Sequence, residues 1–248
     1  MAGFHDEVEL KFAAEGEANL HAWAHNNFAR IHQGLKVVVI DAGGGTVDVS
    51  AYCARHDEAQ RLVFDEIAPA GCLRAGSTTI DEQFWDLATK KLPSLRGVAR
   101  ARKDKVVKKW SAFKRRLKGK KGCVVPLQEC LHGEPAMYGA EGFDTKNGTW
   151  MMTKEDVAHA FEHSVESTTA TVINTLRAAC SSGADSFDIL FAGGLSENDY
   201  FRSEVQARLK ARKPCNVKEL RYERVEAPYH KSVAEGAVLC AVDNIIAR

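Results

Sequence analysis

The segment that most constrains the fold runs from Lys36 to Ser50 and reads KVVVIDAGGGTVDVS. Its β-branched apolar run, Val37 to Ile40, is typical of a buried strand. Three glycines and a second set of β-branched residues follow, and this order predicts an antiparallel hairpin. The turn of that hairpin consists of Gly43, Gly44 and Gly45, so no side chain obstructs access to its backbone.

The glycine turn has the composition of an anion site. Successive glycines can adopt positive φ and bring backbone N–H groups close to a phosphate, and Thr46 adds a hydroxyl. The carboxylates of Asp41 and Asp48 would repel a bare phosphate, so they favour a phosphate that carries a cation. Mg²⁺ is usually held by one or two carboxylates together with phosphates. The residues leave open the alternative of a tight turn between two core strands, without a ligand.

Composition limits the class of protein. The 248 residues are 45% hydrophobic and 27% charged, which suits one large or two small globular domains. A net charge of +1 predicts neither a nucleic acid nor a membrane as partner. The sequence shows no apolar run of about 20 residues and no apolar signal core at its start. Seven cysteines without zinc-type spacing predict reduced thiols in a cytoplasmic protein.

Two further segments combine glycines with a predicted helix. A buried strand ending at Ala192 leads into Gly193 and Gly194, and a helix is expected from about Asn198 to Lys210. Such glycines let a flat ligand lie against the backbone, although strand–Gly–Gly–helix is also a common turn in α/β proteins. Upstream, Gly76, Ser77 and Thr78 precede another helix, where Ser and Thr are good N-caps. Exposed N–H groups there would favour an anion, and capping alone is the alternative.

Residues 96–121 are strongly basic, and apolar residues recur among them at helical spacing. The pattern predicts an amphipathic helix with one buried stripe. A basic helix can bind nucleic acid or a membrane surface, but a solvated face is the more frequent case. We therefore expect neither partner.

Together, these segments resemble the actin-like ATPase superfamily, specifically the heat-shock chaperones of the seventy-kilodalton class. The string DAGGGTVDVS is similar to their second phosphate-binding segment, and Gly193-Gly194 is similar to their adenosine segment. Gly76-Ser77-Thr78 resembles the loop near the phosphates in an atypical branch. Ser232 to Val238 resembles the helix that ends their ATPase domain. The likeness covers only the second lobe of that domain, over about residues 15 to 245.

The resemblance implies an α/β, ribonuclease-H-like lobe, with a mixed sheet, flanking helices and an inserted α/β subdomain. It implies an N-terminal helix in residues 1–33, a core made of 34–77 and 151–248, and the insertion in 78–150. The ligand would be ATP or ADP with Mg²⁺. Client or co-chaperone proteins would be further partners.

The resemblance also assigns roles to individual residues. Catalytic roles fall to Asp41, Asp48 and Glu15, and the two aspartates would hold the metal through water. The residues expected to contact the nucleotide are Gly43, Gly44, Gly45, Thr46, Gly76, Ser77, Lys114, Arg115, Gly193 and Gly194. Glu15 can equally be an ordinary acidic residue at a helix start. The sequence departs from the family where Gly16 replaces a proline, Ser111 replaces a glutamate, and Leu195-Ser196-Glu197 replaces Ser-x-Arg.

Two functions remain open at this level. The first is an ATP-binding lobe of a chaperone-like protein, weak or inactive in hydrolysis by itself, because we find no second phosphate hairpin and no first-lobe lysine. The second is a non-enzymatic interaction module on a degenerate actin-like ATPase fold. The first requires the Gly44 and Gly194 turns to lie side by side around one nucleotide.

Overall fold

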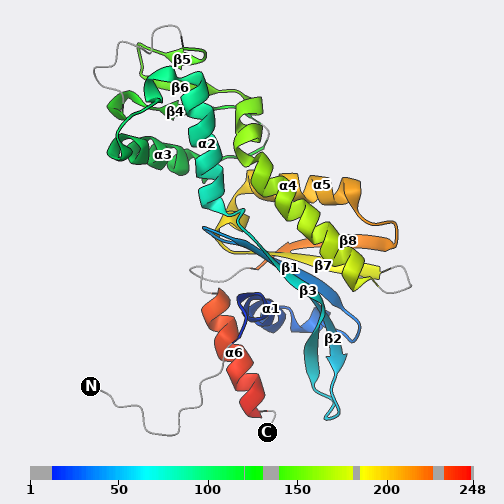
Figure 1. Ribbon diagram of the computed structural model, residues 1–248. Coiled ribbons are helices and arrows are strands. Elements are labelled where there is room, and N and C mark those ends of the chain that lie inside the picture. The colour runs from blue at the N-terminus through cyan, green and yellow to red at the C-terminus, as the bar shows by residue number, and fades with distance from the viewer. Residues whose placement is uncertain (1–12, 120, 131–139, 181–184, 226–231, 247–248) are drawn as a thin grey trace, which may run out of the picture.

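The computed structural model describes residues 13–119, 121–130, 140–180, 185–225 and 232–246. It is an α/β structure with two sheets (Figure 1). The larger sheet has five strands in the order β3-β2-β1-β7-β8, and the smaller has three in the order β4-β6-β5. The predicted α/β class, with a mixed sheet flanked by helices, is therefore confirmed.

The larger sheet combines an antiparallel meander with two parallel strands. Its strands are β1 (Lys36–Ala42), β2 (Val47–His56), β3 (Leu62–Leu73), β7 (Asp185–Ala192) and β8 (Val217–Arg224). The hairpin of β1 and β2 is confirmed, and β3 pairs antiparallel with β2. On the other side of β1, β7 and β8 run parallel. β3 is longer than expected and reaches Leu73, because it stays paired with β2 as far as Val47.

The described residues form six helices and several short turns. They are α1 (Glu15–Asn26), α2 (Ser77–Lys91), α3 (Arg100–Lys114), α4 (Lys154–Ala179), α5 (Asp199–Arg212) and α6 (Ser232–Ile246), with short 3-10 turns η1 (Phe28–Arg30), η2 (Pro93–Leu95), η3 (Gln128–Cys130) and η5 (Gly194–Glu197). The first helix was expected over residues 7–31. It ends at Asn26, and residues 7–12 lie outside the described part of the chain. The helix α3 is shorter than the basic segment 96–121 in which it was predicted, because it begins at Arg100 and ends at Lys114.

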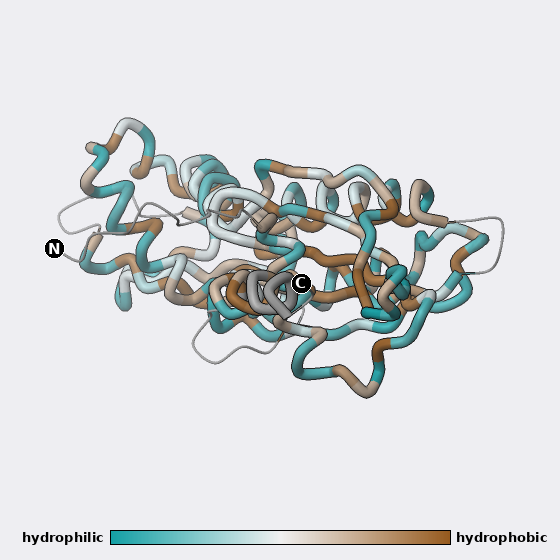
Figure 2. Tube along the Cα trace, turned by 90° about the horizontal axis from the view of Figure 1, so that it is seen from below, coloured by the Kyte–Doolittle hydropathy of each residue, from teal (hydrophilic) through white to brown (hydrophobic). Residues whose placement is uncertain are grey.

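Alternate residues of β1 enter two different cores, because successive side chains of a strand point to opposite faces. Val38 and Ile40 belong to the core on the side of α4 and α5, whereas Val37 and Val39 belong to the core that includes Leu20 of α1. Figure 1 shows α4 and α5 on one side of the sheet and α1 and α6 on the other. Figure 2 shows that the strands near the centre are largely hydrophobic. A strand covered on both faces explains the uninterrupted apolar run.

The long helix α4 begins where its sequence predicts. Thr153 and Asp156 form the expected capping box: the Asp156 N–H donates to Thr153 Oγ1 over 3.2 Å, and the Thr153 N–H donates to Asp156 Oδ2 over 3.0 Å. Asp156 also forms an ion pair with Lys91 at the end of α2, with 2.7 Å between Oδ1 and Nζ. The start of α4 is therefore fixed to the helix that leads away from the glycine turn.

The smaller sheet lies with α2 and α3 beyond one end of the larger sheet (Figure 1). Its strands are β4 (Cys123–Pro126), β5 (Phe143–Asp144) and β6 (Thr149–Met152). Asn147-Gly148 is a turn signal, and the sequence predicts a loop or a hairpin over residues 132–150. The structure has a hairpin of β5 and β6 there, with Gly148 at a φ of +60°. Phe84 stacks on Trp110 with ring centroids 4.5 Å apart, and Trp150 packs beside them. Residues 131–139 of the same predicted loop lie outside the described residues.

None of the seven cysteines forms a disulfide within the described residues. Among the described helices, none is both long enough and apolar enough to cross a lipid bilayer.

Helices α1 and α6 touch through their backbones. A Cβ atom at Gly236 would overlap the carbonyl group of Ala18. The prediction that Gly236 allows close packing against a neighbour is thus confirmed. The preceding residues His230 and Lys231, where the family has an acidic residue, lie outside the described residues.

We predict that Gly236→Ala lowers the free energy of unfolding by about 1–3 kcal/mol, the usual cost of overpacking. The loss occurs although alanine is otherwise about 1 kcal/mol better than glycine inside a helix, because the new methyl group meets backbone that cannot rotate away. Urea unfolding measures the effect. Ala237→Val, at the next and exposed position of α6, is the control, and an equal loss there would contradict this explanation.

Candidate functional site

The glycine turn between β1 and β2 is docked onto the first residues of α2. The N–H groups of Gly76, Ser77 and Thr78 donate to the carbonyl oxygens of Gly45, Gly43 and Gly44, over 3.2, 3.1 and 2.8 Å respectively. The Thr78 hydroxyl donates to the Gly44 carbonyl over 3.0 Å. The turn therefore supplies acceptors to N–H groups that a helix start leaves without an intrahelical partner.

This arrangement corrects the expected role of the loop before α2. Neither Ser77 nor Thr78 caps the helix through its side chain, and Gly76 occupies the N-cap position. The N–H groups expected to attract an anion are instead used by the glycine turn. A Cβ atom at Gly76 would lie 2.6 Å from the Gly44 oxygen, so a glycine is needed for the two backbones to approach.

The docking also orients the turn. No peptide bond in the described residues is cis, and in a trans peptide the N–H points opposite to the preceding carbonyl. With three carbonyls directed at α2, the N–H groups of Gly44, Gly45 and Thr46 point away from it, and none has a backbone acceptor in the described chain. The turn reaches this geometry without positive φ at Gly43, Gly44 or Gly45, contrary to the expectation.

The second glycine pair follows β7, next to the end of β1. Gly193 has a φ of +78°, and a Cβ atom there would overlap both Asp41 and the Ala42 backbone. Nothing lies within 4 Å of the corresponding position at Gly194. The first glycine is therefore required by packing against β1, whereas the second leaves space open.

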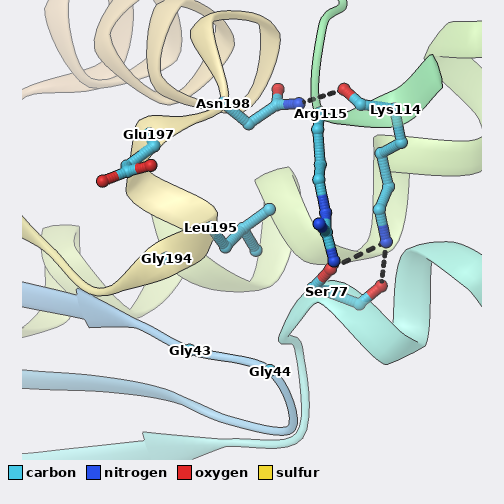
Figure 3. A pocket seen from close by; sticks show the side chains of 9 residues that line it. All are labelled: Gly43, Gly44, Ser77, Lys114, Arg115, Gly194, Leu195, Glu197 and Asn198. Atoms are coloured by element: carbon cyan, nitrogen blue, oxygen red, sulfur yellow. Dashed lines mark hydrogen bonds between the residues drawn. The ribbon is translucent and has the colours of Figure 1, made fainter. Parts of the chain in front are cut away.

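Both glycine segments line one cavity of about 380 Å³. Its walls are formed by Gly43, Gly44, Ser77, Lys114, Arg115, Gly194, Leu195, Glu197 and Asn198 (Figure 3). Ligand pockets in proteins have volumes of roughly 300–1,000 Å³. The turns at Gly44 and Gly194, far apart in the sequence, thus lie side by side, as the nucleotide hypothesis requires.

Asp41 is a buried carboxylate at the end of β1, and only 7% of its surface is exposed. Asn19 of α1 donates a hydrogen bond of 2.7 Å to its Oδ2. The pKa of Asp41 is raised to about 6, first by burial and then by the negative charges of Glu15 and Asp48, and the Asn19 bond partly offsets the rise. Three acidic groups therefore act on one another beside the turn, and a bound cation would relieve their repulsion.

The donor set fits a hydrated Mg²⁺, because carboxylate oxygens are its preferred protein ligands and it retains several waters. Asp48 accepts a hydrogen bond of 3.0 Å from the Thr46 hydroxyl. The oxygens of Glu15, Asp41 and Asp48 do not form a three-ligand cluster within 4.8 Å in the described chain. This spacing suits a metal held through water, which is how the sequence hypothesis describes Asp41 and Asp48.

Lys114 has a different set of partners from the nucleotide contact that the resemblance implies. Its buried ammonium donates to the Ser77 carbonyl, the Ser77 hydroxyl and Asp81 Oδ1, over 2.8, 2.7 and 2.7 Å. Burial lowers the pKa of Lys114, and Asp81 opposes that shift. Since an ammonium has three donors, the protein itself uses all of them. Lys114 fixes the end of α3 to the start of α2.

Arg115 follows directly and is exposed. Figure 3 shows its side chain extended along the cavity wall, beside Lys114 and toward Ser77. A guanidinium plane can stack on an aromatic ring. Arg115 is thus the exposed one of the two cationic side chains in this wall.

Several residues of the site were not identified from the sequence. Asp81 accepts one hydrogen bond from Lys114 and another from the Ser111 hydroxyl. Ser111, which stands where the family has a glutamate, therefore contacts Asp81. Asn198 caps α5 and donates to the Lys114 carbonyl. Asn19 supports Asp41, and its position one helical turn after Glu15 was the available signal. The contacts of Asp81 and Asn198 join segments that are far apart in the sequence, so no local sequence pattern indicates them.

Neither a model of a known protein family nor a curated protein sequence matches this chain. Any functional assignment therefore depends on the geometry of the pocket and on the resemblance of short motifs. The two overlap in part. Among the residues that the resemblance assigns, those lining the cavity are Gly43, Gly44, Ser77, Lys114, Arg115 and Gly194, and those outside its lining are Gly45, Thr46, Gly76, Gly193, Asp41, Asp48 and Glu15.

We predict that Asp41→Asn makes the protein more stable at pH 8. Because the pKa of Asp41 is raised from 3.8 to about 6 on folding, the folded state binds the proton more tightly. Stability is therefore lost as pH rises from about 4 to about 6, by about 2–3 kcal/mol at 1.36 kcal/mol per pKa unit. Urea unfolding at pH 4 and pH 8 measures this difference. It should shrink in Asp41→Asn and persist in Asp104→Asn, an exposed carboxylate on α3; an unchanged difference in Asp41→Asn would contradict the assignment.

Proposed function

We propose that the chain binds an adenine nucleotide with Mg²⁺ between its two glycine turns, as the second lobe of a heat-shock-chaperone-like, actin-like ATPase does. The observation that carries the proposal is that Gly44 and Gly194 line the same cavity. This juxtaposition is what a ligand with a phosphate chain at one end and a flat base at the other requires.

The phosphate end of the ligand lies at the turn between β1 and β2. The N–H groups of Gly44, Gly45 and Thr46 point away from α2 and form a set of parallel donors for phosphate oxygens. Mg²⁺ bridges those phosphates to water molecules held by Asp41, Asp48 and Glu15. The cation offsets both the burial of the Asp41 carboxylate and the repulsion from Glu15 and Asp48, which together raise the pKa of Asp41 to about 6.

The adenosine end lies at Gly194. The open space above this residue lets a ring approach the backbone at the start of η5. Arg115 stands across the cavity and stacks on the base. Leu195, in the same wall, adds apolar contact in place of the polar side chain that the resemblance leads one to expect.

The topology supports the same proposal. The sheet order β3-β2-β1-β7-β8, with a meander followed by parallel strands, is compatible with a ribonuclease-H-like lobe. The two glycine segments follow β1 and β7, which are neighbouring parallel strands paired from Lys36↔Phe187 to Asp41↔Ala192.

Hydrolysis by this chain alone is expected to be negligible. Phosphoryl transfer needs positive charge at the γ-phosphate and a positioned water. One of the two cationic side chains lining the cavity, Lys114, is already bonded to Ser77 and Asp81. That engagement also favours the alternative, an interaction module on the same fold that has lost nucleotide binding.

Titration of the chain with ADP and ATP, with and without Mg²⁺, tests the proposal. We expect saturable, Mg²⁺-dependent binding to one site. Gly194→Val should lower the affinity by about tenfold or more, or ~1.4 kcal/mol, because the side chain fills the space of the base. Its melting temperature should stay close to that of the unmodified protein, since the position is open. Absence of nucleotide binding would favour the interaction module.

Arg115→Ala tests the adenosine end. Loss of a stacked cation should weaken ADP binding by about 2- to 30-fold, from the ~0.5–2 kcal/mol of a cation–π contact. Arg116→Ala removes a neighbouring exposed charge that is not in the cavity wall, and it should leave the affinity unchanged. Equal weakening in both variants would mean that only general electrostatic attraction is involved. Rapid phosphate release from ATP would contradict the expectation of negligible hydrolysis.

A further inference from the structure

A second cluster of ligating side chains lies on the opposite face of the larger sheet from α4. Glu17 and His21 of α1 and Cys240 of α6 each offer a donor atom, and the three atoms lie within 4.8 Å of one another. Glu17 and His21 are four residues apart and so share one face of α1. Within the described residues, this is the one group of three or more such side chains that meets this distance.

The close contact between the two helices brings these residues together. Gly236 packs directly against the backbone of Ala18, the residue that follows Glu17 in α1. Cys240 is one helical turn after Gly236, so it projects from the face of α6 that packs on α1. The glycine contact thus fixes the position of the thiol against the Glu17–His21 pair.

Two aromatic side chains, Phe64 and Tyr52, interact with residues of this cluster. The His21 ring packs edge-on against Phe64 of β3, with centroids 6.0 Å apart and an interplanar angle of 81°. Burial raises the pKa of the Tyr52 hydroxyl, and the charges of Glu17, Glu66 and Cys240 raise it further, whereas a bond with Ser50 lowers it. Cys240 itself is only 8% exposed.

We propose that Glu17, His21 and Cys240 bind a Zn²⁺ ion that fastens α6 to α1. Ligands of a tetrahedral zinc ion lie about 3.5 Å apart, given bonds of about 2.0–2.3 Å, so rotations of these side chains are enough to close the site. Three protein ligands leave the fourth position to water. The site is separate from the nucleotide cavity and does not depend on that function.

The donor types select the metal. A thiolate and an imidazole favour zinc and similar transition metals over Mg²⁺ and Ca²⁺, which prefer oxygen ligands. This site therefore does not compete for the Mg²⁺ proposed beside Asp41. No zinc-type spacing is visible along the chain, because the cysteine belongs to the last described helix and the other two ligands belong to the first.

Cobalt titration of the reduced, full-length chain tests the proposal. Co²⁺ replaces Zn²⁺ in such sites, and a bound thiolate gives a sulfur-to-cobalt charge-transfer band. The two exposed cysteines, Cys72 and Cys215, are first replaced by serine to remove adventitious thiols. We expect one equivalent of Co²⁺ to produce the band and Zn²⁺ to abolish it.

The variants identify the ligands. Cys240→Ser should eliminate the band, and His21→Ala or Glu17→Gln should weaken binding by about a hundredfold or more, because removing even an outer partner costs about 10–100-fold. His25→Ala, an exposed histidine one turn further along α1, is the matched control and should bind normally. Circular dichroism verifies that each variant is folded.

Thermal unfolding gives an independent readout. Zn²⁺ should raise the melting temperature of the parent protein and of His25→Ala, because a ligand that binds the folded state stabilises it by mass action. It should not raise that of His21→Ala. A cobalt band that survives in Cys240→Ser, an absence of any band, or equal zinc stabilisation of His21→Ala and His25→Ala would overturn the proposal.

Discussion

The candidate site depends on one backbone-to-backbone contact, the docking of the β1–β2 turn onto the start of α2. Three N–H groups of the helix start donate to three consecutive glycine carbonyls, which fixes both partners at once. The contact requires glycine at position 76, where a Cβ atom would meet the Gly44 oxygen. It also directs the opposite N–H groups away from α2, where they have no backbone acceptor in the described chain and are the donors that we propose for the phosphates.

A second constraint is electrostatic. Asp41 is buried at the end of the central strand, beside Glu15 and Asp48, and the fold stabilises it with only one amide, that of Asn19. Burying a carboxylate among other acids costs stability unless a cation or proton compensates. Perturbed carboxylates of this kind are common at functional sites, and the Mg²⁺ proposed beside Asp41 would be such a cation.

The sequence was sufficient for features encoded in local patterns. The Val37–Ile40 run, the glycine turn and the Thr153 capping box predicted β1, its hairpin and α4, because propensity and burial agree there. The side-by-side position of Gly44 and Gly194 followed from motif resemblance rather than from periodicity. The engagement of Lys114 by Asp81 could not be foreseen, since it depends on how α2 and α3 pack against each other.

The central claim is that the outward N–H groups of the glycine turn receive the phosphates while Gly194 faces the base. Amide chemical shifts of the ¹⁵N-labelled chain, recorded during titration with Mg²⁺–ADP, test it most directly. The account predicts that the largest shifts occur at Gly44, Gly45, Thr46 and Gly194, and that they saturate together. Shifts confined to other surfaces, with these four amides unmoved, would contradict it.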